Sequence, residues 1–226
     1  MTACRTVLVA LAVTVTLASC GVTADPPPPT VAELRQTLLT VDDVGPGFTA
    51  ADGDGDDEDD EGPSDVGGSK RCRSLAARIG GRGSEDSDAE AAFFTADGAA
   101  VFHAYDRPDG DGDDLDVDEV VELIDTCRTV TIDTGDSVGK ARITGGPVDG
   151  LGDEAVELRV SLELTEPVEA AVESVFYLWQ RDSVSGLVGA VDGIDPSTGE
   201  AVPVGLDQAR DWAETADRRL ADVIES

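Results

Sequence analysis

A serine near the middle of the chain stands in a pattern typical of hydrolase nucleophiles. Residues 135–139 read Gly-Asp-Ser-Val-Gly, which matches the G-x-S-x-G nucleophile elbow with Ser137 at its centre. A serine nucleophile needs a base within hydrogen-bond reach, but the only histidine, His103, stands upstream of it, whereas hydrolases with this elbow place it downstream. An elbow also needs a helix after the turn, and residues 140–144 have the pattern of a strand. We therefore expect a glycine-rich turn and no catalytic residue, and a secreted serine hydrolase or esterase that uses Ser137 is the alternative.

The other candidates for chemistry are the histidine itself and two acidic runs. His103 lies in a strand-like stretch, where a structural role is the common one, although its ordinary pKa would also suit a pH sensor. Residues 109–113 read Asp-Gly-Asp-Gly-Asp and begin like an EF-hand loop, but Asp114 and Val120 stand where that loop needs glycine and glutamate. The run at 52–61 fails in the same way. We expect no defined metal site and no cofactor.

The first twenty residues have the pattern of a bacterial lipoprotein signal. Arg5 precedes an uncharged apolar run at residues 6–17, which suits the core of a signal peptide and is too short to span a bilayer. The sequence LASC at 17–20 then resembles a lipobox. It predicts removal of residues 1–19 and acylation of Cys20, with chains such as palmitate, and two or more acyl chains hold a protein stably on a membrane.

A proline-rich tether follows the lipidation site. Residues 20–29 end in four consecutive prolines, which favour an extended polyproline spacer. We therefore expect a protein anchored by lipid to the cell membrane on its extracytoplasmic side. Its single folded domain should cover residues 30–226.

The cysteines fit the same compartment. Cys4 belongs to the signal peptide and Cys20 to the anchor, which leaves Cys72 and Cys127. An exported domain permits disulfides, so we expect these two residues to be bonded to each other. Zinc is the rival interpretation, but two cysteines and one distant histidine lack the spacing of a zinc site.

The charge of the chain excludes some partners. With 48 acidic and 16 basic residues, the formal net charge is −32. Nucleic acids need clustered Lys and Arg, so we expect no nucleic-acid partner. Eight acids fall within residues 52–61, and a block of like charges repels itself. We expect a disordered, solvated insert at about residues 50–69 that the fold does not need.

Hydrophobic periodicity predicts an α+β domain. Thr30 and Glu33 form a capping-box pattern that should start a short helix, and Asp42-Asp43 should end it. Helical periodicity returns at 116–128, with Cys127 on the apolar stripe, and at 206–224. Strand patterns, with a hairpin signal at Asp97-Gly98, occupy residues 89–95, 99–106, 129–133, 140–144, 155–164, 172–180 and 187–191. We expect an antiparallel sheet packed by N-terminal, central and C-terminal helices.

The order of these features resembles a family of actinobacterial lipoproteins that are similar to the extracellular sensor domains of certain bacterial Ser/Thr kinases. The matching parts are the lipobox, residues 38–48 (LLTVDDVGPGF), Cys72, a helix that ends at Cys127, residues 150–155 (GLGDEA) before a strand, and the C-terminal helix. The resemblance implies a sheet backed by helices, with a cleft for an unidentified ligand. Some members have two disulfides, whereas this chain has cysteines for one, and it carries no kinase domain. The family supplies no catalytic residues.

These observations predict a binding or sensor-type envelope lipoprotein with an unknown small-molecule or protein ligand. A cleft would draw on the aromatic residues of the sheet, although core packing is the default for 175–179; these residues are Phe102, Tyr105, Tyr177 and Trp179. Besides the hydrolase, an acidic surface protein with a structural role is an alternative.

Overall fold

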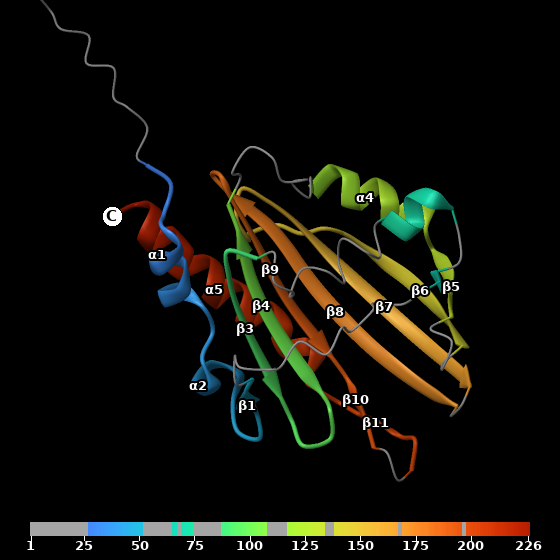
Figure 1. The fold of residues 1–226 in the computed structure, drawn as a ribbon. Coiled ribbons are helices and arrows are strands. Elements are labelled where there is room, and N and C mark those ends of the chain that lie inside the picture. The colour runs from blue at the N-terminus through green and yellow to red at the C-terminus, as the bar shows by residue number, and fades with distance from the viewer. Residues whose placement is uncertain are drawn as a thin grey trace, which may run out of the picture.

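The computed structural model describes residues 27–51, 65–66, 69–74, 87–107, 117–133, 138–166, 169–195 and 198–226. These segments form one antiparallel sheet with helices packed against it, and Cys72 and Cys127 are joined in a disulfide (Figure 1). The predicted α+β class, with N-terminal, central and C-terminal helices, is confirmed. Within the described residues, no helix is long and apolar enough to cross a membrane.

Nine strands form the sheet, and the described strands are β1 (Thr49–Ala50), β2 (Asp65–Val66), β3 (Ala89–Phe94), β4 (Ala100–Asp106), β5 (Thr129–Asp133), β6 (Val138–Pro147), β7 (Glu154–Glu166), β8 (Ala170–Arg181) and β9 (Val184–Val191). Their order is β1-β3-β4-β9-β8-β7-β6-β5-β2, and all neighbours are antiparallel. A separate two-stranded ribbon pairs β10 (Gly193–Ile194) with β11 (Ala201–Val202). The strands β5 to β9 form a meander, and the β3–β4 hairpin, predicted at Asp97-Gly98, adds to β9.

Alternation along the strands builds a hydrophobic core on each face of the sheet. Along β8, Val175, Tyr177 and Trp179 pack in one core, whereas Phe176 and Leu178 pack in the other. The bulky side chains that the sequence places on both faces of this strand are therefore accounted for by two cores.

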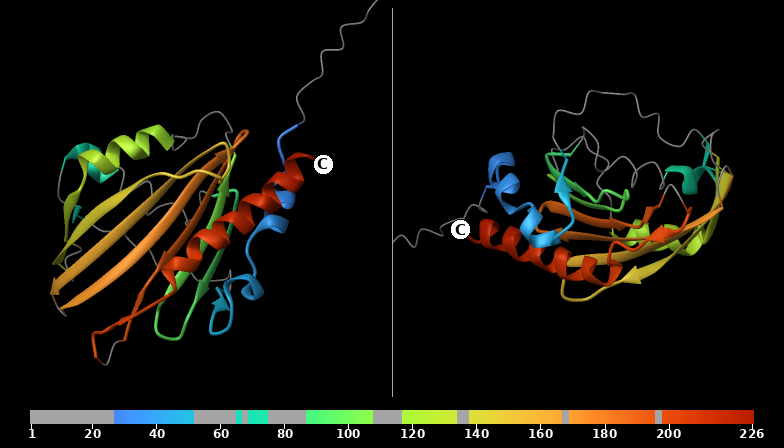
Figure 2. Two further views of the ribbon diagram at one scale, coloured as in Figure 1. Left: turned by 180° about the vertical axis from the view of Figure 1, so that it is seen from behind. Right: turned by 90° about the horizontal axis from the view of Figure 1, so that it is seen from below.

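Different helices cover the two faces. α5 (Ala209–Ile224), which follows the 3-10 turn η1 (Leu206–Gln208), packs on β8 and β9, and α1 (Val31–Thr37) packs on α5 and β3. α4 (Val117–Thr126) packs on the other face, against β6, β7 and β8. The sheet is curved, and α5 lies on its convex side (Figure 2). The core beneath α4 is therefore on the concave face.

Two capping boxes shape the segment that precedes the sheet. The Thr30 backbone N–H donates to Glu33 Oε2 (2.7 Å), and the Glu33 N–H donates to Thr30 Oγ1 (3.3 Å), as predicted. The residues expected to end this helix instead form a second one, α2 (Val41–Val44). Asp43 caps it by accepting from the Thr40 N–H (2.7 Å). The expectation for Asp42-Asp43 was wrong because an aspartate three residues after a threonine is also a helix start signal.

The region expected to be a solvated insert connects the two edges of the sheet. Ala50 pairs in β1 at one edge, and Asp65 and Val66 pair in β2 at the other. The expected disorder of residues 52–64 falls outside the described residues. Because the sheet is nine strands wide, the link between Ala51 and Asp65 has to reach from one edge to the other. Its length is therefore a requirement of the fold, which the sequence does not reveal.

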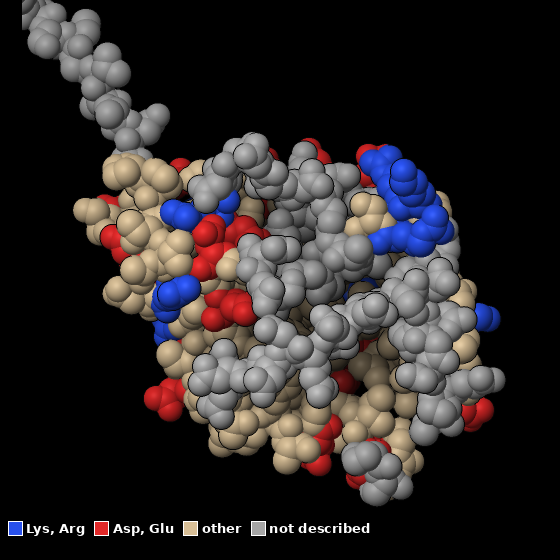
Figure 3. All heavy atoms as spheres, in the orientation of Figure 1, with Lys and Arg blue, Asp and Glu red and all other residues tan. Residues whose placement is uncertain are grey.

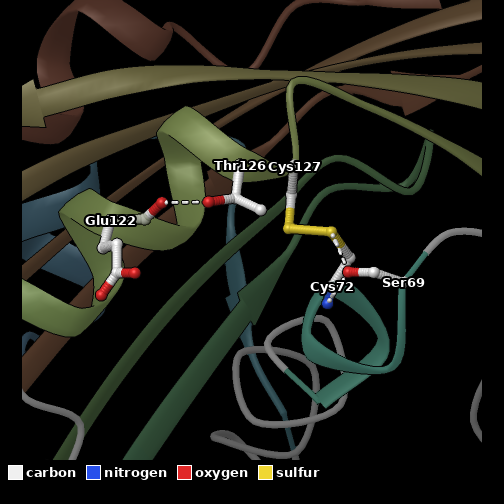
Figure 4. The surroundings of a disulfide bond; sticks show 5 residues. All are labelled: Ser69, Cys72, Glu122, Thr126 and Cys127. Atoms are coloured by element: carbon white, nitrogen blue, oxygen red, sulfur yellow. Dashed lines mark hydrogen bonds between the residues drawn. A yellow bond between two sulfur atoms is a disulfide. The ribbon is translucent and has the colours of Figure 1, made fainter.

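The disulfide ties α4 to a short helical turn at residues 70–74 (Figure 4). The two Cα atoms are 5.6 Å apart, and both cysteines are buried in the concave-face core. Ser69 Oγ accepts from the Cys72 backbone N–H at 3.2 Å, which caps the turn. The predicted pairing and the inward orientation of Cys127 are confirmed.

Candidate functional site

Several residues singled out in the sequence lie outside the described residues. They are Cys20, Ser137 and the acidic runs 52–61 and 109–113. The elements around Ser137 are nonetheless defined, because β5 ends at Asp133 and pairs in antiparallel fashion with β6, which starts at Val138. A strand, and not the helix of a nucleophile elbow, therefore follows the serine. No three potential metal-ligating side chains come together among the described residues.

His103 is part of the convex-face core and not of an open site. Its side chain is 1 % exposed, and its Nδ1 accepts the backbone N–H of Leu39 at 3.0 Å. The ring also packs edge-on against Tyr105, with centroids 4.5 Å apart. Burial, and secondarily the nearby Arg219 guanidinium, lowers the pKa of His103 to about 3. The imidazole is therefore neutral and structural, as the sequence led us to expect.

Three of the four aromatic residues considered for a cleft are buried beneath α1 and α5. Tyr105, Tyr177 and Trp179 are each at most 3 % exposed. The Tyr105 hydroxyl donates to the Ala216 carbonyl of α5 (2.9 Å), and the Tyr177 hydroxyl donates to Glu157 Oε2 (2.6 Å). A cleft-lining role for these three is wrong, because their positions in the strands point them toward the helices. The default of core packing is confirmed for Tyr177 and Trp179.

Phe102 is the exception and points to the concave face. It is half-buried and lines a pocket of about 130 Å³, which we call the Phe102 pocket and define by its lining residues, Ala51, Glu90, Ala91, Ala92, Phe102, His103 and Ala104. Because Phe102 alternates with His103 and Ala104 along β4, the same strand supplies the pocket wall on one face and the buried histidine on the other.

Small residues make the hollow. In the register of β3 and β4, Ala92 lies opposite Phe102, and Ala104 lies opposite Glu90. The two methyl side chains form the floor between the two larger ones. On the next strand Gly189 lies opposite Phe102, and a Cβ there would stand 2.6 Å from the ring of Phe176. Glycine at this position therefore lets a second aromatic ring lie over the concave face.

The pocket has an aromatic end and an acidic end. Phe102 packs edge-on against Phe94 at 6.0 Å between centroids, and Phe94 is 39 % exposed. At the other end, the exposed Glu90 carboxylate has no hydrogen bond or ion pair with another side chain of the described segments. Its partial burial, together with the carboxylate of Asp106, raises the pKa of Glu90. In Figure 3 acidic atoms lie over β3 and β4 with basic atoms beside them, and a further group of basic atoms lies at the far side of this face.

Two of the segments on which the family resemblance is based, residues 38–48 and 150–155, are hydrogen-bonded to α5. Asp43, from residues 38–48, accepts from Arg219 Nη2 (2.7 Å), and Gly152, from residues 150–155, donates its N–H to Asp217 (3.1 Å). Arg181 completes the second contact with two hydrogen bonds to Asp217, at 2.7 and 2.6 Å. These motifs therefore fix helix positions in this structure.

Sequence reasoning missed the roles of Glu90 and of the small residues. The alternation of Ala89–Phe94 predicts which of its side chains share a face, but Glu90, which is exposed in the structure, has the pattern of an ordinary solvent-facing residue. A run of alanines opposite an aromatic residue was the available signal.

Comparison of the chain with protein-family models, with curated proteins and with solved structures finds no match. The family resemblance therefore stays a prediction.

Proposed function

We propose that the protein is a lipid-anchored envelope protein, displayed on the extracytoplasmic side of the membrane, whose domain binds a ligand in the Phe102 pocket. The lipobox at Cys20 supports the anchor. The disulfide between Cys72 and Cys127 supports an oxidising compartment, since such bonds persist mainly in exported proteins.

The observation that carries the binding role is the Phe102 pocket. An aromatic ring stands half-exposed over a floor of alanines, on a sheet face whose other half is covered by α4. The ring of Phe102 is not fully buried, because the hollow beside it is unfilled. A bound apolar group would bury the rest of the ring and gain on the order of 1 kcal/mol. Ligand sites combine such apolar walls with few polar groups, and here Glu90 is the polar group.

The flanking strands do not favour the hydrolase alternative, since Ser137 is followed by β6. The protein is therefore proposed to recognise its ligand without chemical conversion.

The test is to isolate the full-length lipoprotein from the cells that produce it and to identify bound small molecules by mass spectrometry. Ala92→Leu fills the floor of the pocket, and Ala171→Leu makes the same change at an exposed position of β8. We expect a co-purifying molecule that Ala92→Leu loses and Ala171→Leu keeps. A molecule retained equally by both variants, or none in any of them, would argue against the pocket as the binding site.

A further inference from the structure

We propose that the Phe102 pocket selects ligands with an organic ammonium group, which Glu90 pairs in charge and Phe102 contacts through its ring. This inference rests on the proposed function and adds the chemical class of the ligand. Aromatic faces beside a carboxylate are the combination that recognises alkylammonium cations in proteins, because the ring quadrupole attracts the cation while its methyl or methylene groups are desolvated.

The placement of the charges supports a cation. Glu90 and Asp106 both belong to the concave face, since Asp106 continues the alternation of Phe102 and Ala104 along β4. Partial burial of Glu90, and secondarily repulsion between its carboxylate and that of Asp106 at the same end of the apolar hollow, raises the pKa of Glu90. A bound cation would stabilise the ionised form of Glu90.

Among the described segments, no lysine or arginine forms an ion pair with Glu90. Arg107 follows β4, but its Nε and Nη2 donate to the two oxygens of Asp88 at 3.2 and 3.1 Å, and its backbone N–H donates to Asp88 at 2.8 Å. Both described side-chain contacts of this guanidinium are with Asp88, and neither is with Glu90.

The size of the pocket restricts the ligand. A volume of about 130 Å³ is close to that of engineered protein cavities of roughly 150 Å³ that hold benzene. A compact headgroup such as trimethylammonium fits this space, whereas a bulky polycyclic cation does not. The net charge of −32 would also raise the concentration of cations near the surface at low ionic strength.

The test compares choline with its uncharged carbon isostere, in which carbon replaces the ammonium nitrogen. Each is titrated into the isotopically labelled protein at low ionic strength, and binding is followed by shifts of the backbone amides of Ala92, Phe102 and Ala104. Because the two probes have the same shape, the ratio of their affinities reports recognition of charge. We expect choline to bind about tenfold more tightly.

Two variants locate the effect. Glu90→Gln should weaken choline binding about tenfold and leave the isostere unchanged. Glu163→Gln, which removes an exposed carboxylate from β7 at the other side of the sheet, should leave both affinities unchanged.

The outcomes separate this inference from the proposed function. Equal affinities for choline and the isostere, both lost in Ala92→Leu, would overturn charge recognition and keep the pocket as an apolar binding site. Binding of choline that Glu90→Gln and Glu163→Gln weaken equally would mean general attraction to an acidic surface and would overturn the inference. If neither probe moves the three amides while a neutral molecule co-purifies with the lipoprotein, the inference alone fails; if nothing co-purifies either, both fail.

Discussion

His103 illustrates how the face of the sheet to which a side chain points determines its environment. Along β4 the histidine points into the core under α1, and the residues beside it, Phe102 and Ala104, point into the pocket. A strand sequence predicts this alternation but not which face receives the helices. The structural role of His103 could therefore be expected, whereas the choice of Phe102 over Tyr105 as a pocket wall could not. The Nδ1 atom accepts from Leu39, so the proton of the neutral ring is on Nε2, which has no hydrogen-bond partner among the described residues.

We predict that His103 makes the protein sensitive to mild acid. Its pKa in the folded state is about 3, below the unfolded value of about 6.5. Above pH ~6.5 both states are neutral at this residue. As the pH falls below that value, only the unfolded state takes up the proton, so stability is lost until the pH reaches the folded pKa. Between pH ~6.5 and ~4.5 this loss is about 2 to 3 kcal/mol.

The measurement is the free energy of urea unfolding at about pH 7 and pH 4.5. His103→Asn keeps an acceptor oxygen near the position of Nδ1 for the Leu39 N–H but cannot be protonated. Carboxylates titrate alike in both proteins, so the difference between the two pH dependences isolates the histidine. Identical pH dependences would contradict a buried neutral His103.

At the scale of the elements, Arg219 of α5 holds the segment between α1 and α2 by hydrogen bonds. Arg219 Nη1 donates to the Leu38 carbonyl (3.0 Å), and its two terminal nitrogens bind both oxygens of Asp43 (3.0 and 2.7 Å). Burial of Asp43 alone would raise its pKa, but the hydrogen bonds from Arg219 and Thr40 outweigh this and lower it. Local patterns predicted the first capping box and the amphipathic face of α5. They did not predict the hydrogen bonds from Arg219 to Leu38 and Asp43, because these residues are far apart from Arg219 in the sequence.

Replacing Arg219 by Met should destabilise the domain by about 1 to 2 kcal/mol, since a partly buried carboxylate and a carbonyl lose their donor. The backbone amide of Leu39 should exchange faster with solvent, because the segment between α1 and α2 loses its link to α5. Arg218→Met is the matched control. Arg218 is exposed, and its one hydrogen bond to a described residue goes to the Thr215 hydroxyl (3.3 Å), so this variant should change stability by less than about 0.5 kcal/mol. Equal losses of stability in the two variants would argue against a stabilising role of the Arg219 hydrogen bonds.

The disulfide joins elements that the sheet alone does not hold together. The bond closes a loop with a sequence separation of 55 residues, for which chain entropy gives roughly 4 kcal/mol. The double variant Cys72→Ala/Cys127→Ala should therefore unfold at distinctly lower urea concentration than the oxidised protein. Reduction of the wild-type protein should have nearly the same effect. Unchanged stability in both cases would show that the bond does not constrain the unfolded chain as we expect.

Two features concern the molecule as a whole: its proposed attachment to the membrane, and the link between the two edges of its sheet. One is the proposed lipidation signal near the N-terminus, which is a local pattern of four residues. The other is the pairing of β1 and β2 at opposite edges of the sheet, which unites distant segments. Strand patterns predicted the presence of β3 to β9, but they covered only residues 140–144 of β6 and 187–191 of β9, which run over Val138–Pro147 and Val184–Val191. The two-residue edge strands β1 and β2 are too short to give a hydrophobic period, so the sequence did not predict them.

Replacing Cys20 by Ala should release the protein from the membrane or leave its signal uncleaved, because the thiol that receives the lipid is gone. Membrane and soluble fractions of producing cells, probed for the domain, measure this. Cys4→Ala removes a cysteine that precedes the cleavage position and should leave anchoring unchanged. A processed Cys20→Ala protein that still sediments with membranes would contradict the lipid anchor.

The acidic run between β1 and β2 should be dispensable in charge but not in length. Neighbouring strands lie about 4.8 Å apart, so the eight spacings across the sheet amount to ~38 Å along its surface. Deleting residues 52–61 leaves three residues between Ala51 and Asp65, which reach at most ~14 Å. Even across a curved sheet this is too short, so β1 or β2 must detach. We expect the deletion to lower Tm by a few degrees. Hydrogen exchange should also become faster, either at the Ala51 amide, which donates to the Ala92 carbonyl (2.8 Å), or at the amides of β2.

Changing the eight acids to Asn and Gln keeps the length of the segment and reduces its self-repulsion. Tm should therefore hold or rise at low salt, and its difference from the wild-type value should shrink as salt is added. A deletion variant as stable as the wild-type protein would mean that β1 and β2 do not both pair at opposite edges of the sheet.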